Sequence, residues 1–229
     1  MASQERDPFT DPDELFDVLD AAGQATGRAK RRADVHRDGD WHRALHCWVL
    51  DVCDPARPCL LYQRRGAHKD TWPSRLDVTV GGHYASGETL VDVLREAEEE
   101  IGQVVTLDKL IRLGMRQVVS DGGQGRQGRG GVKDYEIQDI FLWRSALPLE
   151  AYRPQPVEVS ALERVAVVDA LALLSGQIGR VASRRLLPSG EQSDGWVTED
   201  ELIPSLDRYF YRVAVAADLA TRGYPHLVI

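Results

Sequence analysis

The sequence predicts an α/β fold, and two patterns along the chain support that prediction. Short runs in which apolar and polar residues alternate, as in a strand with one buried face, recur between residues 14 and 168. They are interrupted at residues 89–102, where apolar side chains have helical spacing and Gly102 supplies a stop signal. At 229 residues the chain can hold one sizeable domain and a smaller appendage.

The predicted strands follow one another along the chain, and turn-forming Gly, Pro, Asp or Ser separates most of them. They occupy residues 14–20, 26–29, 44–52, 58–63, 76–80, 110–119, 135–143 and 164–168. The pattern further predicts a short helix at residues 169–174 and a long amphipathic helix at residues 199–222.

We expect three parts in the chain. Residues 1–12 hold Pro, Asp and Gln with little to bury, which predicts a disordered N-terminus. The main domain covers residues 13–176, and residues 177–229 form a helical extension that packs on this domain or on a second subunit. Within the domain, the Gly-rich run at residues 121–131 predicts a mobile loop.

The overall charge restricts the partners that we expect. A formal net charge of −8 and a pI near 5.3 create a field that repels nucleic acid and anionic membranes. No stretch has the length and apolarity of a membrane span, and Cys47, Cys53 and Cys59 form no CxxC pair. We therefore expect a soluble cytoplasmic protein that acts on a small molecule. The C-terminal helix offers a surface for a homodimer.

Three carboxylates on the predicted helix indicate a metal site. Glu96, Glu99 and Glu100 are spaced by three and four residues, so they project from one side of the helix, opposite its apolar side. Such crowding is unfavourable without a cation, and Mg²⁺ or Mn²⁺ prefers carboxylate oxygen. Arg95 can pair with one of these carboxylates and hold it in place. The alternative is a merely solvated helix face.

A fourth carboxylate is predicted on a strand. In residues 135–141 the alternation places Glu136 on the face opposite Tyr135. Facing the helix, Glu136 could bind metal or take the proton from attacking water. The alternative for Glu136 is an exposed strand residue. Glu99 is the second candidate for the base, and the sequence does not choose between the two.

Candidate substrate contacts lie on both sides of residues 76–80. The pair Gly81 and Gly82 forms a predicted turn in which the backbone can approach metal or phosphate without a side chain in the way. Arg64, Arg65 and Lys69 follow a predicted strand, where they could bind substrate phosphates or only form a solvated rim.

The segment from Gly82 to Gln103 resembles the Nudix box, written G-x5-E-x7-R-E-U-x-E-E-x-G-U, where U is a bulky apolar residue. The positions that match it are Gly82, Glu88, Arg95, Glu96, Glu99, Glu100 and Gly102. Only six residues separate Glu88 from Arg95, where the family has seven. Ala97 is small for its apolar position, and Gln103 replaces the last apolar one.

The resemblance extends over roughly residues 14–175 and is greatest to the Nudix branch that includes the isopentenyl-diphosphate isomerases. It rests on residues 35–44, residues 63–65, Lys69, Trp72-Pro73 and residues 77–83. In that branch, two histidines before the first core strand, a histidine after the Gly and two acidic residues on a later strand bind metal. The resemblance assigns these roles to His36, His42, His83, Asp134 and Glu136. For His36 and His42, which we place at a strand entry, a hydrogen bond to loop backbone is the alternative.

One difference from the isomerases concerns the reaction. They carry a catalytic cysteine where this chain has Gly81, whereas hydrolysis needs only activated water. The resemblance therefore implies a Nudix α/β/α sandwich with a mixed sheet, to which a C-terminal helix is added. It further implies a metal-dependent hydrolase acting on a nucleoside diphosphate derivative or related diphosphate. The alternatives are an isomerase-like enzyme acting on a prenyl diphosphate, and a nucleotide-sensing Nudix module without catalysis.

Overall fold

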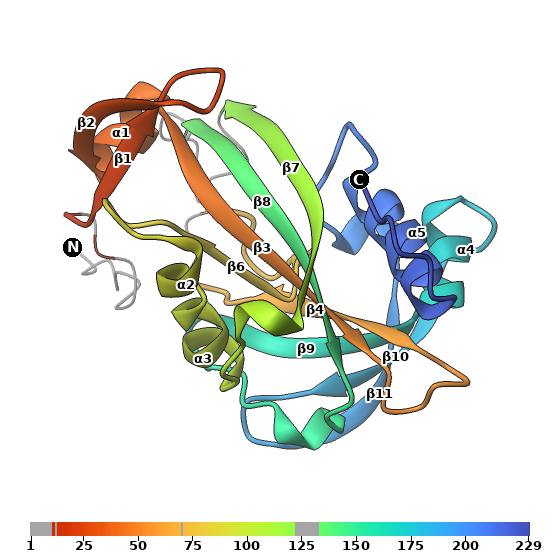
Figure 1. Ribbon diagram of the computed structural model, residues 1–229. Helices are drawn as coiled ribbons and strands as arrows, with labels where there is room; N and C mark the ends of the chain where they lie inside the picture. Colours follow the sequence, from red (N-terminus) through yellow and green to blue (C-terminus); the bar gives the residue numbers. More distant parts are fainter. Residues whose placement is uncertain (1–10, 12, 70, 122–132) are drawn as a thin grey trace.

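The computed structural model describes residue 11 and residues 13–69, 71–121 and 133–229 (Figure 1). The predicted disordered N-terminus and Gly-rich loop therefore lie almost wholly outside the described residues. Among the residues that are described, no helix combines the length and apolarity needed to cross a membrane.

The strands of the described residues join in one mixed sheet. They are β1 (Leu15–Leu19), β2 (Ala25–Arg31), β3 (Trp41–Asp51), β4 (Cys59–Arg65), β5 (Leu76–Asp77), β6 (Val80–His83), β7 (Leu110–Asp121), β8 (Lys133–Ser145), β9 (Val159–Ala166), β10 (Val181–Leu186) and β11 (Gln192–Val197). The main path runs β11-β10-β9-β4-β3-β1-β2, while β6 and β8 also pair with β3, β7 with β8, and β5 with β4. The β3–β8 pair is parallel and the other pairs are antiparallel.

Helices cover both faces of this sheet, which confirms the predicted α/β/α arrangement (Figure 1). They are α1 (Arg32–Asp38), α2 (Leu90–Val93), α3 (Arg95–Ile101), α4 (Val167–Leu174) and α5 (Tyr209–Thr221). On one face, Val93, Ala97 and Ile101 of α2 and α3 pack into a buried apolar cluster with the sheet. On the other face, α4 and α5 form a second cluster around Trp48 and Val213. The sheet thus separates two apolar cores.

The single helix predicted at residues 89–102 is divided in the structure. Thr89 and Asp92 form a capping box that begins α2, and the chain leaves helical hydrogen bonding at Leu94 before α3 begins. The helix ends as predicted at Gly102, whose φ of 68° is readily adopted by glycine. The break lies between Glu88 and Arg95, where the box is one residue short.

The prediction of an exclusively helical C-terminal extension was wrong. Residues 177–229 include the hairpin β10–β11, which continues the sheet beyond β9. Within β10 the buried Val181 and Ser183 alternate with exposed neighbours, the pattern of a half-buried strand. The predicted helix at residues 199–222 is present only as α5, which begins at Tyr209.

Candidate active site

The main cavity is about 980 Å³ and is lined by one end of the sheet, the box helix and a late segment of the chain. β3, β6, β7 and β8 provide its floor, and α3 provides one wall. Further lining side chains come from two other segments, namely Arg65, Lys69, Thr71 and Trp72, and most of residues 203–210. Side chains far apart in sequence therefore meet in one hollow, as expected for a ligand site.

The sheet register places the strand-borne candidates side by side. Parallel pairing sets His42 of β3 opposite Glu136 of β8, and antiparallel pairing sets Ala44 opposite His83 of β6. Positions two apart on a strand share a face, so Asp134, Glu136, His42 and His83 all face the same side. His36 arrives from α1, which corrects its predicted place at a strand entry.

Three of these side chains hold buried polar atoms without a hydrogen-bond partner among the described residues. They are His36 Nε2, His42 Nε2 and Asp134 Oδ1. The two nitrogens lie 3.7 Å and 3.4 Å from Asp134 Oδ1, and one ligand atom each from these three residues and His83 falls within 4.8 Å of the others. Unsatisfied buried atoms are costly, and a metal cation would satisfy all three. The residues present therefore fit a metal.

Two of the three histidines are in the protonation state that a metal requires, whereas Asp134 and Glu136, against the effect of burial, raise the pKa of His42. Burial and nearby positive charge lower the pKa of His36 to about 2 and that of His83 to about 4, so both rings are neutral near pH 7. His42 Nδ1 lies 3.1 Å from the carbonyl oxygen of Asp40, so this nitrogen bonds backbone while Nε2 points at Asp134. Of the two roles considered for His42, the hydrogen bond to backbone is made by Nδ1, and Nε2 is the nitrogen that could bind a metal.

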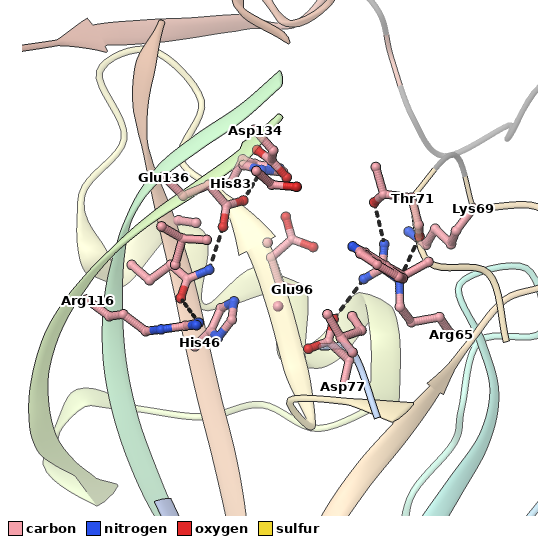
Figure 2. Close-up of a pocket in the computed structure, with 18 of the residues that line it drawn as sticks. His46, Arg65, Lys69, Thr71, Asp77, His83, Glu96, Arg116, Asp134 and Glu136 are labelled. Carbon is pink, nitrogen blue, oxygen red and sulfur yellow. Dashed lines mark hydrogen bonds and ion pairs between the residues drawn. The ribbon is translucent and has the colours of Figure 1, made fainter. Parts of the chain in front are cut away.

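Glu136 is buried, which excludes the alternative of an exposed strand residue. Its Oε1 lies 2.8 Å from His83 Nε2. Figure 2 shows Glu136, His83 and Asp134 together on one side of Glu96, with Lys69, Arg65 and Thr71 on the other.

The box carboxylates differ in burial. Glu100 is 3% exposed, and its Oε2 accepts hydrogen bonds from Gly81 N at 3.0 Å and Gln63 Nε2 at 3.4 Å. Glu99, in contrast, has a side chain that is 59% exposed at the cavity rim. Burial raises the pKa of Glu96 to about 7 and that of Glu100 to about 8. The alternative of a merely solvated helix face is therefore wrong for these two carboxylates.

Gly81 and Gly82 lie in β6 rather than in the predicted turn. Glycine is needed at 82 because a Cβ there would lie 2.3 Å from Glu96 Cδ, at the place that this carboxylate side chain occupies. The sequence suggested that metal or phosphate would approach the backbone here, but in the structure the Glu96 side chain occupies this place.

Arg95 holds the box carboxylates together, as its position in the sequence suggested. Its guanidinium lies 2.9 Å from Glu88, 3.3 Å from Glu96 and 3.8 Å from Glu99. Glu88 also accepts a hydrogen bond of 2.8 Å from Ala85 N. Glu88 therefore anchors Arg95 and the loop before α2.

The structure separates the basic residues predicted to bind substrate. Arg65 and Lys69 line the cavity. Arg65 is fixed by bonds of 3.1 Å to Thr71 O and 2.9 Å to Asp77, and Lys69 pairs with Glu158. They are held in place beside the acidic cluster and can meet substrate phosphates.

Arg64 lies outside the cavity lining. It forms ion pairs of 3.2 Å with the fully buried Glu163 and 2.9 Å with Glu201. Arg65 faces the cavity, whereas Arg64 faces Glu163. The bonds of Arg64 instead link β4 to the turn that leads into residues 203–210.

Several lining residues were not identified from the sequence. Arg116, Gln138 and His46 line the cavity from the sheet, and residues 203–210 line it from the C-terminal part. Strand alternation could have placed Gln138 on the face of Glu136. No sequence pattern indicated that residues 203–210 would reach the site.

Comparison with known proteins yields consistent matches. The family model described as the NUDIX domain matches residues 42–186. The chain is 37% identical over 158 residues to Nudix hydrolase 3 of Arabidopsis thaliana, a match that covers 67% of this chain but 19% of that protein. It is 28% identical over 209 residues to a Nudix hydrolase of Clostridium acetobutylicum, covering 90% of this chain and 97% of the relative.

Two further matches concern the branch and the fold. The chain is 33% identical over 139 residues to an isopentenyl-diphosphate Delta-isomerase of Mycolicibacterium vanbaalenii, covering 60% of this chain and 71% of the relative. The crystal structure of DR0079 from Deinococcus radiodurans superposes with a TM-score of 0.51 at 21% identity, covering 71% and 90% of the two chains. This last likeness concerns the fold alone.

Proposed function

The chain belongs to the Nudix family and is a diphosphate-cleaving hydrolase of that family, and on this premise we propose its substrate and cofactor. The substrate is a nucleoside diphosphate linked to a second group, or a related diphosphate. The cofactor is Mg²⁺ or Mn²⁺. The observation that carries the proposal is the pair of buried carboxylates, Glu96 and Glu100, beside a group of unsatisfied histidine and aspartate atoms in the same cavity.

The cavity divides the ligand roles between sheet and helix. His36, His42, His83, Asp134 and Glu136 would hold a cation from the sheet side. Glu96, Glu99 and Glu100 would hold one from α3. The chemistry that Mg²⁺ or Mn²⁺ supplies when bound is activation of water and neutralisation of phosphate charge.

The protein's own residues bind the diphosphate and move the proton. Arg65 and Lys69 meet the phosphates across the cavity from Glu136 (Figure 2). Glu99 and Glu136 are the two candidates for accepting the proton from attacking water. Glu99 reaches the rim with little burial, whereas Glu136 already bonds His83.

A second candidate function is that of an isopentenyl-diphosphate isomerase. The relative from Mycolicibacterium vanbaalenii carries that name, which favours it. Gly81 argues against it, because glycine has no side chain to donate or accept a proton. A sensing module is disfavoured because Glu96, Glu99 and Glu100 are all retained.

One assay separates these functions. Purified protein is incubated with a panel of nucleoside diphosphate derivatives and with isopentenyl diphosphate, with Mg²⁺, with Mn²⁺ or with chelator. We expect metal-dependent release of phosphate or a nucleoside monophosphate. Isomerised prenyl diphosphate without phosphate release would contradict hydrolysis and support the isomerase. Tight ligand binding without turnover would support the sensing module.

We further propose a cytoplasmic location, a small-molecule partner and a possible homodimer. Cys47, Cys53 and Cys59 are free, which suits the reducing cytoplasm. The net charge of −8 favours a small-molecule partner over nucleic acid or membrane. A homodimer formed through the C-terminal part would be measured by light scattering of the purified chain.

A further inference from the structure

The segment of residues 203–210 closes one side of the cavity although it lies beyond the residues that match the family model. Ile203 N donates a hydrogen bond of 3.0 Å to Leu76 O, which ties the start of the segment to the sheet. At its other end, Tyr209 Oη lies 2.8 Å from Trp48 Nε1 and 2.9 Å from His46 Nδ1. The segment is therefore fixed against β3 and β5 at both ends.

This segment presents Asp207 to Arg116 of β7. Arg116 Nε and Nη2 donate to the two oxygens of Asp207, both at 2.8 Å, and Nη2 also lies 3.1 Å from Ser205 Oγ. The guanidinium carbon lies 4.3 Å from the centre of the Tyr209 ring. A bidentate pair of this kind fixes the plane of a guanidinium as well as its position. Asp207 and Tyr209 therefore hold Arg116 in one orientation.

Arg116 in turn determines how Gln138 is oriented. Its Nη1 donates to Gln138 Oε1 at 3.1 Å, and Gln138 Nε2 donates to Glu136 Oε2 at 2.5 Å. A glutamine amide can present either its oxygen or its nitrogen to a neighbour, but arginine has only donors. Arg116 thus requires the oxygen of Gln138 to face it, which turns the nitrogen toward Glu136. Figure 2 shows Arg116 on the same side of the cavity as Glu136.

We propose that Asp207 is a positioning residue that acts through Arg116 and Gln138 to orient the Glu136 carboxylate toward its metal. This inference rests on the proposed function of the same cavity. Without Asp207, Arg116 loses its bidentate partner, and the remaining contacts with Ser205 and the Tyr209 ring hold it less firmly against Gln138. The amide could then rotate and present its oxygen to the carboxylate, and Glu136 would lose a donor that fixes it opposite His83.

Burial alone would raise the pKa of Asp207, but hydrogen bonds from Arg116 and Ser205 lower it to about 2. The bidentate pair is therefore charged throughout the pH range in which the enzyme would be assayed. An asparagine at this position keeps the size and removes both the charge and one acceptor oxygen.

The test compares Asp207→Asn with wild type and with Asp218→Asn. Asp218 is a matched control because it lies on α5 and pairs with Arg222 at 2.8 Å, outside the cavity. Loss of an outer partner of a metal ligand costs roughly 10-fold or more in metal affinity or activity. We expect Asp207→Asn to weaken Mn²⁺ binding and lower kcat by about that factor. KM and Tm should change little, and Asp218→Asn should resemble wild type.

A double-mutant cycle tests whether Asp207 acts through Glu136. In a Glu136→Gln background, Asp207→Asn should cause no further loss of Mn²⁺ affinity or kcat, because the carboxylate that it orients is gone. A further loss of the full single-mutant factor would overturn the inference. So would wild-type Mn²⁺ affinity and kcat in Asp207→Asn, with or without a lower Tm, or an effect confined to KM.

The inference can fail independently of the proposed function. If wild type binds Mn²⁺ and cleaves a diphosphate while Asp207→Asn does both equally well, only the positioning role is wrong. If wild type neither binds Mn²⁺ nor cleaves any diphosphate, the proposed function fails and the inference fails with it.

Discussion

The two groups of candidate metal ligands differ in how the chain holds them. The strand-borne group is placed by the hydrogen-bonded registers of β3 with β6 and β8, and its ligand atoms already lie within 4.8 Å of one another. The helix-borne group sits on the seven-residue α3, where Glu100 is buried and Glu99 is largely exposed. The comparison teaches that the sheet register brings the candidate ligands of one group together, whereas the carboxylates of α3 differ widely in burial.

The electrostatic states of the two groups follow from this difference. His83 of the strand-borne group and His36 of the adjoining α1 are neutral near pH 7, so their burial costs little. Buried carboxylates without a cation favour protonation, as the raised pKa values of Glu96 and Glu100 show. The protonation of Glu96 and Glu100 on α3 should therefore depend strongly on whether a cation is bound.

The largest expected effect distinguishes Glu100 from its neighbour Glu98. Glu100→Gln should lower kcat by about 100-fold or more, with folding retained, because it removes a proposed ligand of a cation whose charge stabilisation is worth several kcal/mol. Glu98→Gln removes the same charge from the same helix but lies outside the cavity lining, so it should keep nearly full activity. The measurement is turnover of the substrate found in the panel. Equal activities of the two variants would contradict the helix-borne site.

A smaller effect is expected on Mn²⁺ affinity without substrate, and it distinguishes the strand-borne from the helix-borne ligands. If the sheet preassembles the strand-borne group, His42→Gln should weaken Mn²⁺ binding to the substrate-free protein by roughly 10- to 100-fold. Glu99→Gln should change this affinity much less, because its carboxylate is exposed. Titration calorimetry of chelator-treated protein measures both, with His226→Gln as an exposed control. A larger loss in Glu99→Gln than in His42→Gln would reverse the comparison.

The smallest effect concerns stability and pH. Burial raises the pKa of Glu100 in the folded state to about 8, above the ordinary glutamate value of 4.5. The folded state therefore binds more protons, and this group contributes less stability as pH rises from 4.5 to 8. In chelator, Glu100→Gln should match wild type below pH 4.5 and have a higher Tm by roughly 5 °C at pH 8.

Thermal unfolding at several pH values, with and without Mg²⁺, measures this difference. Added Mg²⁺ should reduce or reverse it, since a cation stabilises the ionised carboxylate. A Tm difference that is constant with pH would show that Glu100 stays ionised in the folded apoprotein.

Much of the fold and part of the site could be predicted because both follow from short periodicities. Strand alternation placed Glu136 on the correct face, and helical spacing placed Glu96 and Glu100 together. Which side chains share a face of one strand or helix depends only on their spacing in sequence, so the sequence alone predicts it. The resemblance supplied His36, His42 and His83, which the structure brings together.

The remaining features depend on contacts between distant segments. Whether Arg64 or Arg65 enters the cavity is decided by Glu163 and Glu201, which pair with Arg64 from other elements. The hairpin β10–β11 is placed by the pairing of β10 with β9, which lies about 20 residues earlier in the chain. The role of Asp207 depends on Arg116, which is 91 residues away in sequence.

At Gly82, one added methyl group would be enough to remove catalysis while ligand binding is kept. A Cβ at this position would lie 2.3 Å from Glu96 Cδ, so we expect Gly82→Ala to displace that carboxylate while Arg65 and Lys69, the proposed phosphate contacts, stay in place. Such a chain would hold its ligand without cutting it. The same substitution would therefore give a variant with which the intact natural ligand can be captured from a mixture.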